Sequence, residues 1–271
     1  MVILVFADIF GRPGRRAVAH ALPELKAKYQ PDILIANVEN LAGGRGVSRK
    51  TLNELKELGF HVFTSGNHLW DNKEVFGLLD SEKTFFRPAN FSNPPGDPCP
   101  GRGFGFVEVN GKKIFVINLI GRVFMDMAED PFATVDRILK ENPVDCPVFV
   151  DMHADATSEK YAMGWHLAGR VAAVTGSHSH VQTADERILP GGTAYITDVG
   201  MSGSFDSVIG LRPAEVIKKF MTRRPHSTQS ARENPGICAV VIKLGEDRKA
   251  ESIERLRYSV GIAVEGTDYE P

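Results

Sequence analysis

Short apolar runs alternate with helical segments in the first third of the chain. Val2 to Ala7 is a continuous apolar run rich in branched residues, which is typical of a strand covered on both faces. Arg15 to Tyr29 places apolar residues at helical spacing, and Asp32 to Val38 repeats the strand pattern. A helix capped by Ser48 and a third strand, His61 to Thr64, follow. This alternation predicts a parallel sheet joined by crossover helices.

The remainder of the chain predicts further strands and helices after a long irregular loop. Arg87 to Gly105 is rich in Pro, Gly and Asn, and the dipeptide Asn110-Gly111 lies between two apolar runs as in a tight hairpin. We expect helices over 131–140 and 215–221, strands over 104–109, 113–119, 148–152, 171–175, 186–189 and 193–197, and a closing antiparallel pair over 237–244 and 252–258. The sequence contains no repeat and no convincing linker, so we expect a single α/β domain of two or three layers over residues 1–271.

Composition narrows the class of protein. The chain has 271 residues with 32 Lys+Arg and 34 Asp+Glu, a formal net charge of −2, and 42% hydrophobic residues, which is the globular range. This charge balance argues against a long nucleic acid as partner. No apolar run approaches the roughly 20 residues of a membrane span, and no secretory signal is present, so we expect a cytoplasmic protein without a membrane partner. The three cysteines are far apart and predict reduced thiols.

Polar residues with metal-binding chemistry gather directly after the predicted strands. Carboxylate, amide or imidazole groups stand at five successive strand ends, on Asp8, Glu39, Asn40, Asn67, His68, His153, His178 and His180. Because the carboxyl ends of parallel strands form one crevice, these side chains should converge. Oxygen and imidazole donors without thiolate suit a pair of divalent metals, the usual device for phosphoester hydrolysis. If the segment from His178 to His180 is extended, both rings lie on one side and serve neighbouring metals.

Each of these signals also has a plain structural interpretation. A single Asp or Asn after a strand is commonly a turn or helix cap, but chance placement at five strand ends is improbable. The other four histidines are interpreted as structural: His20, His61, His166 and His226. Gly43-Gly44-Arg45-Gly46 would either wrap a phosphate or form a tight turn, and the missing P-loop Lys favours the turn. Phe124, Met125 and Met127 are expected in the core rather than in a pocket.

Several motifs resemble those of a known enzyme family. Gly66-Asn67-His68, His153 and Gly176-Ser177-His178-Ser179-His180 resemble three signature blocks of the calcineurin-like metallophosphoesterases. Where that superfamily usually has Asp-x-His and Gly-Asp, this chain has Asp8-Ile9-Phe10-Gly11 and Val38-Glu39-Asn40. The motifs that this chain has instead resemble those of the YmdB-type branch, whose members hydrolyse 2′,3′-cyclic nucleotides. The resemblance runs from Met1 to about Gly210.

The resemblance implies a fold and a metal centre. The fold would be α/β of the calcineurin-like type, with a central two-sheet β-sandwich flanked by helices, so the single parallel sheet would become two mixed sheets. The resemblance implies that Glu39 bridges two metals and that His68 is the general acid. One metal would be held by Asp8, Glu39, Asn40 and His180, and the other by Glu39, Asn67, His153 and His178. Iron is the implied metal, with manganese next, and ligand chemistry alone does not separate them from zinc.

The expected function is that of a phosphodiesterase. A metal-bridging hydroxide would attack the phosphorus of a small 2′,3′-cyclic nucleotide, and His68 would protonate the departing 2′ oxygen to give a nucleoside 3′-phosphate. Two alternatives stay open: a broader phosphomonoesterase or phosphodiesterase, and a metal-dependent regulatory protein without turnover. A homo-oligomer is also expected, and the polar segment from Arg223 to Pro235 is either a mobile loop or a subunit contact.

Overall fold

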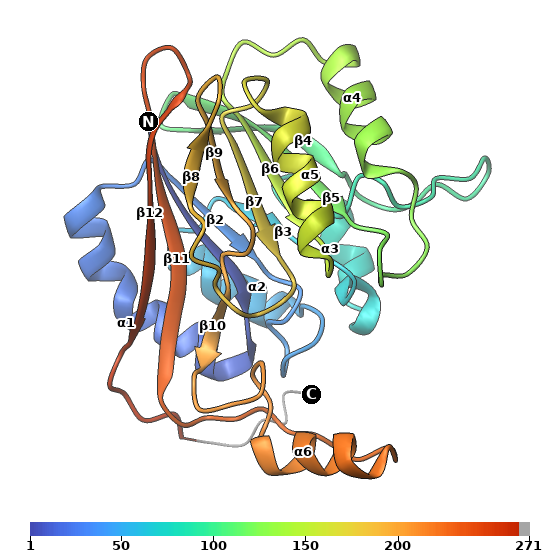
Figure 1. The fold of residues 1–271 in the computed structure, drawn as a ribbon, viewed down its shortest axis with the longest axis vertical. Helices are drawn as coiled ribbons and strands as arrows, with labels where there is room; N and C mark the ends of the chain where they lie inside the picture. The colour runs from blue at the N-terminus through green and yellow to red at the C-terminus, as the bar shows by residue number, and fades with distance from the viewer. Residues whose placement is uncertain (266–271) are drawn as a thin grey trace.

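The computed structural model describes residues 1–265 and contains two six-stranded mixed sheets (Figure 1). The first sheet has the strand order β12-β11-β10-β1-β2-β3 and the second has the order β4-β5-β6-β7-β9-β8. The strands of the first sheet are β1 (Val2–Ile9), β2 (Ile33–Asn37), β3 (Val62–Thr64), β10 (Met201–Ser204), β11 (Pro235–Leu244) and β12 (Ala250–Ser259). Those of the second are β4 (Phe104–Val109), β5 (Lys112–Ile120), β6 (Val148–His153), β7 (Ala173–Ser177), β8 (Arg187–Leu189) and β9 (Thr193–Ile196). Each sheet has a parallel centre and antiparallel strands at an edge.

Helices cover the outer faces of both sheets. The covering helices are α1 (Gly11–Tyr29), α2 (Arg49–Glu57), α3 (Val75–Ser81), α4 (Pro131–Glu141) and α5 (Thr157–Leu167), whereas α6 (Pro213–Thr222) projects from the body and η1 (Leu69–Asp71) is a short 3₁₀ turn. Apolar residues of α1, α2 and α3 pack on the first sheet, and those of α4 and α5 pack on the second. The layers are therefore helix, sheet, sheet, helix, which confirms the two-sheet fold that the family resemblance implied.

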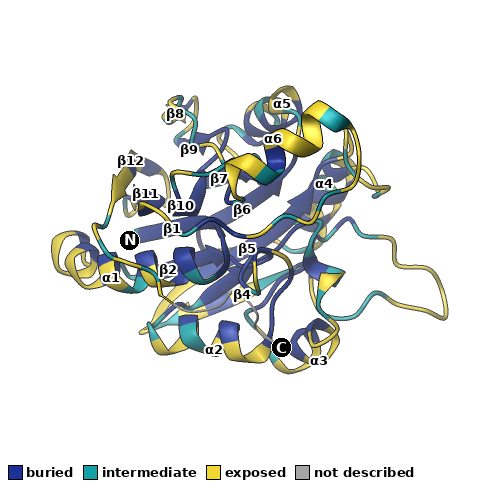
Figure 2. Ribbon diagram, turned by 90° about the horizontal axis from the view of Figure 1, so that it is seen from below, coloured by how far each residue is buried: buried dark blue, intermediate teal, exposed yellow. Residues whose placement is uncertain are grey.

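Alternation along β1 shows how one strand serves two layers. Leu4 and Phe6 belong to the apolar cluster under the helices, whereas Ile3 and Val5 belong to the cluster between the sheets. All four are at most 3% exposed, as the continuous apolar run predicted. Figure 2 shows that the strands of both sheets are largely buried, while α6 is mostly exposed.

Several sequence predictions of local structure are confirmed. Ser48 caps α2 with a capping box that it shares with Thr51, and Asn110-Gly111 turns between β4 and β5 with positive φ at both residues. Three elements were not predicted, namely β10, α3 and α5. The expectation that Phe124, Met125 and Met127 lie in the core is wrong, because none of the three is buried and Phe124 and Met127 are 86% and 101% exposed on the loop before α4.

The carboxyl ends of the parallel strands meet at one end of the molecule, the lower end in Figure 1, where α6 projects from the body. Among the described residues, no helix is both long and apolar enough to cross a membrane. That one domain spans residues 1–271 stays a prediction, and residues 266–271 lie outside the described residues.

Candidate metal centre

The first candidate ligand, Asp8, lies in a distorted part of β1. The register of β1 against β10 shifts between Ala7 and Ile9, and Asp8 adopts a positive φ of 42°. Its carboxylate is completely buried, and Oδ2 accepts a hydrogen bond of 2.9 Å from the backbone N–H of His178. The bulge therefore turns this side chain toward the end of β7 instead of continuing the alternation of the strand.

Glu39 and Asn40 follow β2 and are also buried. Glu39 Oε2 accepts a hydrogen bond of 2.9 Å from the N–H of His68, and Glu39 Oε1 lies 3.2 Å from His153 Nε2 without hydrogen-bond geometry. The Asn40 amide nitrogen donates to the carbonyl of Gly44, which leaves its oxygen directed elsewhere. Glu39 thus contacts residues from the ends of two other strands.

His153, Asn67 and His178 come together around Glu39. His153 Nε2 lies 2.9 Å from Asn67 Oδ1 and 3.1 Å from His178 Nδ1. One ligand atom each from Glu39, His153 and His178 fall within 4.8 Å of one another. Glu39, His153 and His178 belong to one of the two ligand sets that the family resemblance implied, and that assignment stays a prediction.

Unsatisfied oxygens indicate what the site is built to hold. Among residues 1–265, four buried side-chain polar atoms lack a hydrogen-bond partner, and three of them are Asp8 Oδ1, Glu39 Oε1 and Asn40 Oδ1. Buried acceptors are rarely left unpaired, because each unmade bond costs about 1–3 kcal/mol. Three such acceptors, together with the imidazole nitrogens of the neighbouring histidines, are donors that bind cations, so the donor chemistry of this site fits metal ions.

The pKa values of these groups reflect burial and mutual charge. Burial would raise the pKa of Glu39, but the attraction of His153 outweighs it and lowers this pKa to about 2. Burial would lower the pKa of His153, yet Glu39 raises it to about 9. Burial and the charge of His153 lower the pKa of His178 to about 4, and burial raises the pKa of Asp8 to about 6. A cation would take over the charge compensation that the proton on His153 now gives to Glu39.

His180 lies on the Asp8 side of the site. The electrostatic effect of His180 on Asp8 opposes the rise in the pKa of Asp8 that burial causes. His180 Nδ1 lies 2.9 Å from the carbonyl oxygen of Ile209, and the imidazole ring packs edge-on against Phe10. The expected extended conformation from His178 to His180 is wrong, because φ is 101° at His178 and 63° at His180. The two rings are therefore placed by turns rather than by strand alternation.

His68 is placed next to this cluster. Its N–H is bound to Glu39, and its Nδ1 lies 2.9 Å from Asp71 Oδ2 at the end of η1. The His68 side chain is 25% exposed, so it reaches solvent from the edge of a buried centre. An imidazole between a carboxylate and a solvent-accessible site is suited to proton transfer.

Sequence reasoning missed the groups that hold these ligands in place. Lys160 and Asp198 form a buried ion pair of 2.7 Å, and Asp198 Oδ2 accepts from the N–H of Ser179, between the two histidines. Gly66, the first residue of the motif Gly66-Asn67-His68, has a steric role: a Cβ atom at this position would lie 2.2 Å from the His153 ring. Neither Lys160 nor Asp198 carries a local signal, because the pairing joins segments that are distant in sequence.

The remaining candidates have structural roles. Gly43, Gly44 and Gly46 all have positive φ, which supports the tight-turn interpretation of this loop. Three of the four other histidines are bonded within the fold, His61 to the N–H of Leu34, His166 to Asp136 and His226 to Thr222, and His20 lies exposed on α1.

Known proteins with similar sequence and structure share this whole architecture. The family model of YmdB-like proteins matches residues 4–256. A 2′,3′-cyclic-nucleotide 2′-phosphodiesterase of Bacillus subtilis (strain 168) is 45% identical over 258 residues, which cover 94% of this chain and 96% of that protein. A crystal structure of a protein from Thermus thermophilus is 40% identical with a TM-score of 0.88, and covers 96% of this chain and 99% of its own.

Two further structures extend the comparison. A phosphatase from Mycoplasma pneumoniae is 33% identical with a TM-score of 0.90, over 96% of this chain and 93% of that chain. A 5′-nucleotidase from Candida albicans is 11% identical with a TM-score of 0.54, over 96% of this chain and 51% of that chain, so it supports the fold alone.

Proposed function

The chain belongs to the family of YmdB-like proteins, and from this premise we propose that it hydrolyses 2′,3′-cyclic nucleotides to nucleoside 3′-phosphates. One observation carries the proposal: three buried oxygens without a hydrogen-bond partner, on Asp8, Glu39 and Asn40, stand at strand ends, and Glu39 also accepts from the backbone N–H of His68. A phosphodiester needs both cations and a proton donor, and these residues supply the places for both. The name of the relative from Bacillus subtilis supports the choice of substrate.

The residues divide into two metal-binding sets that share Glu39. We assign Asp8, Glu39, Asn40 and His180 to one metal, and Glu39, Asn67, His153 and His178 to the other. When bound, the two metal ions would neutralise charge on the phosphoryl oxygens and lower the pKa of water. We propose iron as the resident metal, with manganese and then zinc as alternatives, because carboxylate, amide and imidazole donors suit all three.

His68 would deliver the proton that the leaving group needs. Attack of water on phosphorus forms one P–O bond and releases a proton to solvent, and the bond from phosphorus to the ribose 2′ oxygen breaks. That oxygen takes a proton from His68 Nε2, and His68 regains a proton from solvent. Asp71 accepts from Nδ1 at 2.9 Å and so keeps Nε2 directed away from itself and available to the substrate. The hydrogen bond from the backbone N–H of His68 to Glu39 holds the proton donor at a fixed distance from the metal centre.

A substrate panel and one variant pair test this proposal. His68→Ala should keep the metal content of the wild-type protein and lose roughly 10²–10⁴-fold in turnover of 2′,3′-cyclic nucleotides, while His20→Ala, an exposed histidine on α1, serves as the matched control. The panel contains 2′,3′-cyclic nucleotides, 3′,5′-cyclic nucleotides and nucleoside monophosphates, with products identified by chromatography.

Each outcome decides between the alternatives. A 2′-phosphate product or unchanged turnover in His68→Ala would refute the role of His68. Equal turnover across the panel would favour a broader phosphoesterase. Nucleotide binding without product would favour a regulatory protein.

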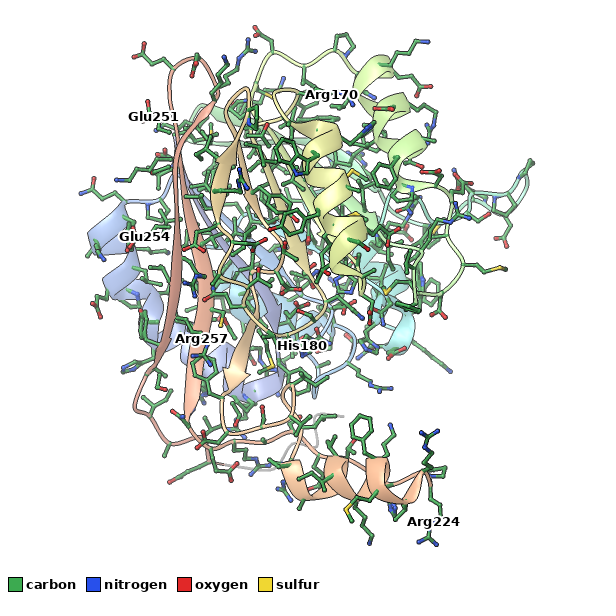
Figure 3. All side chains as sticks on the ribbon, in the orientation of Figure 1. Arg170, His180, Arg224, Glu251, Glu254 and Arg257 are labelled. Atoms are coloured by element: carbon green, nitrogen blue, oxygen red, sulfur yellow. The ribbon has the colours of Figure 1, made fainter. Side chains whose placement is uncertain are left out.

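We further propose that the protein acts as a homo-oligomer through α6. This helix buries only Val216, and it exposes Ile217, Phe220 and Met221, the last two by 76% and 81%. Figure 3 shows Arg224 at the far end of α6, away from the body that carries His180. An exposed apolar patch on a projecting helix is typical of a subunit contact. Phe220→Asp should reduce the mass measured by light scattering, and an unchanged mass would place the contact elsewhere or exclude it.

A further inference from the structure

A buried carboxylate lies behind the metal ligand His153. Asp151 precedes His153 by two residues on β6, and both side chains are at most 4% exposed. Ser177 stands between them: its Oγ lies 3.0 Å from His153 Nδ1 and donates to Asp151 Oδ1 at 2.8 Å. The other carboxylate oxygen, Oδ2, accepts from Thr64 Oγ1 at 2.5 Å and from Asn37 Nδ2 at 3.3 Å. Asp151 therefore joins the ends of strands from both sheets.

The direction of each hydrogen bond in this group follows from its partners. Asn37 Oδ1 accepts from the backbone N–H of Glu39 at 3.2 Å, so the amide nitrogen of Asn37 must face Asp151. An amide nitrogen only donates, which makes Asp151 Oδ2 an acceptor. An ionised Asp151 has only acceptor oxygens, so Ser177 gives its one hydroxyl hydrogen to Asp151 Oδ1. Toward His153, as toward Asn37 Nδ2 at 3.5 Å, the Ser177 oxygen can then only accept.

This order of donors fixes the proton of His153. Because Ser177 accepts, His153 must carry a hydrogen on Nδ1, and the position left for metal binding is Nε2. Nε2 is also the atom that faces Glu39 Oε1 and Asn67 Oδ1. Histidine ligands depend on such an outer partner for tautomer and ring orientation.

We propose that Asp151, acting through Ser177, is a positioning residue that holds His153 in the tautomer whose Nε2 binds metal. The inference rests on the metal centre of the proposed function and adds two residues outside the proposed ligand sets. It accounts for a buried carboxylate that the reaction itself does not use.

Asp151→Asn tests the proposal most directly, because the neighbouring donors determine how the new amide group is oriented. Asn37 and Thr64 both donate toward Oδ2, so the substituted side chain would keep its oxygen there and present its NH₂ group to Ser177. The Ser177 oxygen would then accept from that NH₂ group and turn its own hydrogen toward His153 Nδ1, which disfavours the metal-binding tautomer. Ser177→Ala removes the connection altogether with a small change in volume. Thr64→Val is the matched control, since it removes one donor to Asp151 and leaves the Ser177 connection intact.

The readout is metal affinity rather than turnover. Full-length protein is depleted of metal and titrated with Zn²⁺ against a chromophoric chelator, with circular dichroism to verify folding. We expect Asp151→Asn and Ser177→Ala to lose roughly 10–100-fold in Zn²⁺ affinity, the range seen when an outer partner of a histidine ligand is removed, and Thr64→Val to lose much less.

A spectroscopic signature separates positioning from general stability. In Zn²⁺-loaded wild-type protein and Thr64→Val, the His153 Nδ1–H proton should exchange slowly with solvent in ¹⁵N-edited NMR spectra, assigned by its loss in His153→Gln. In Ser177→Ala, this slow exchange should be lost.

The outcomes are distinguishable from failure of the proposed function. Zn²⁺ affinity unchanged in both Asp151→Asn and Ser177→Ala would overturn this inference alone. An equal loss in all three variants would show a general structural role and overturn it as well. Absence of Zn²⁺ binding by the wild-type protein would overturn the proposed metal centre and, with it, the inference.

Discussion

The two ends of the parallel strands are both polar, but their polar groups are arranged differently. At the carboxyl end, Lys160 and Asp198 form an ion pair of 2.7 Å with side chains that are 1% and 0% exposed. At the amino end, Arg248 and Asp145 form one of 2.6 Å, with Arg248 48% exposed and Asp145 fully exposed. The two ion pairs thus have nearly equal N···O distances but opposite burial. Removing one partner of the buried pair should cost more stability than removing one partner of the exposed pair.

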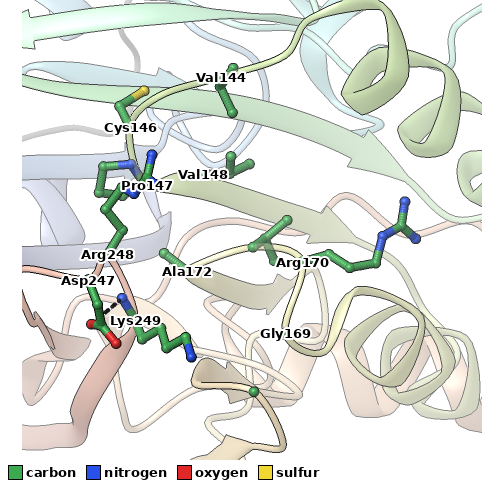
Figure 4. Close-up of a pocket in the computed structure, with 12 residues that line it drawn as sticks. Val144, Cys146, Pro147, Val148, Gly169, Arg170, Ala172, Asp247, Arg248 and Lys249 are labelled. Carbon is green, nitrogen blue, oxygen red and sulfur yellow. Dashed lines mark hydrogen bonds between the residues drawn. The ribbon is translucent and has the colours of Figure 1, made fainter.

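The amino end also has a pocket, but the buried unpaired oxygens described above are not found there. A pocket of about 250 Å³ lies between the starts of β6 and β7 and the turn from β11 to β12, lined among others by Cys146, Arg170 and Lys249 (Figure 4). Arg170 is paired with Asp136, and the three unpaired oxygens of the metal centre are all at the other end. Unsatisfied buried acceptors therefore distinguish the functional end better than concavity does.

Positive φ at non-glycine residues occurs at both ends, with Gln30, Asn110 and Arg248 at the amino end, but only at the carboxyl end does it fall on candidate metal ligands. Asp8, His178 and His180 have positive φ at the carboxyl end, and such conformations cost non-glycine residues about 1–3 kcal/mol each. The buried pair supports this strain, because Lys160 donates to the carbonyl of Ser177 and Asp198 accepts from the N–H of Ser179. The site is built from conformations that the surrounding fold must hold.

The largest expected effect comes from Glu39, the residue that we propose to be shared by both metals. Glu39→Gln keeps the size of the side chain but removes its charge, so both metal sites should weaken. We expect kcat/KM to fall by roughly 10⁴-fold, about 5 kcal/mol of transition-state stabilisation, together with a loss of metal content measured by mass spectrometry. Glu57→Gln, an exposed residue on α2, is the control. Turnover within tenfold of wild type at full metal content would contradict the assignment of Glu39.

Removing one member of the buried ion pair should be the next largest effect. Lys160→Met leaves Asp198 charged and without its cation in the interior, which should lower the free energy of unfolding by about 3–5 kcal/mol in urea titrations. The double variant Lys160→Met/Asp198→Leu removes both charges and should regain part of this loss. If the free energy of unfolding of Lys160→Met falls by less than about 1 kcal/mol, this pair contributes no more to stability than an exposed ion pair does.

A smaller effect should appear as pH dependence of the metal-free protein. The pKa of His153 is raised from 6.5 to about 9, so its contribution to stability is fully present below pH 6.5 and is lost as pH rises through about 9. The loss is on the order of 3 kcal/mol, because each pKa unit corresponds to about 1.36 kcal/mol. Asp8, Glu39 and His178 titrate mainly below this window.

Urea unfolding of chelator-treated protein at several pH values measures this dependence. The His153→Gln variant should lack it, and a wild-type stability that rises from pH 6.5 to about 9 would contradict the pairing of His153 with Glu39.

The sequence predicted the strand ends well because the relevant signals are local. Glu39, Asn40 and His153 each stand at or just after an apolar run, and that pattern needs no knowledge of partners. The helix α5 was missed because it buries Glu159 and Lys160 along with apolar residues, so it lacks the usual apolar stripe. The strand β10, with the sequence Met-Ser-Gly-Ser, has no alternation to reveal it.

The outer partners of the site were not predictable in the same way. Asp151 looked like an ordinary strand residue, and the contacts behind its proposed role appear only when β6 is placed beside β7 and opposite Thr64. The extended conformation expected for His178 to His180 failed for the same reason, since the turns depend on Asp198 from a distant segment. The candidate ligands follow from local pattern, whereas the groups that hydrogen-bond to them follow from tertiary contacts.

The smallest expected effect belongs to the amino end. Arg248→Ala removes a pair whose members are both solvated, so the urea midpoint, Zn²⁺ affinity and turnover should all stay at their wild-type values. The variant also opens one wall of the pocket in Figure 4 without touching the metal centre. A fall in turnover with unchanged stability would mean that this end communicates with the site through β6 and β7. The division between a functional and a structural end of the strands would then no longer hold.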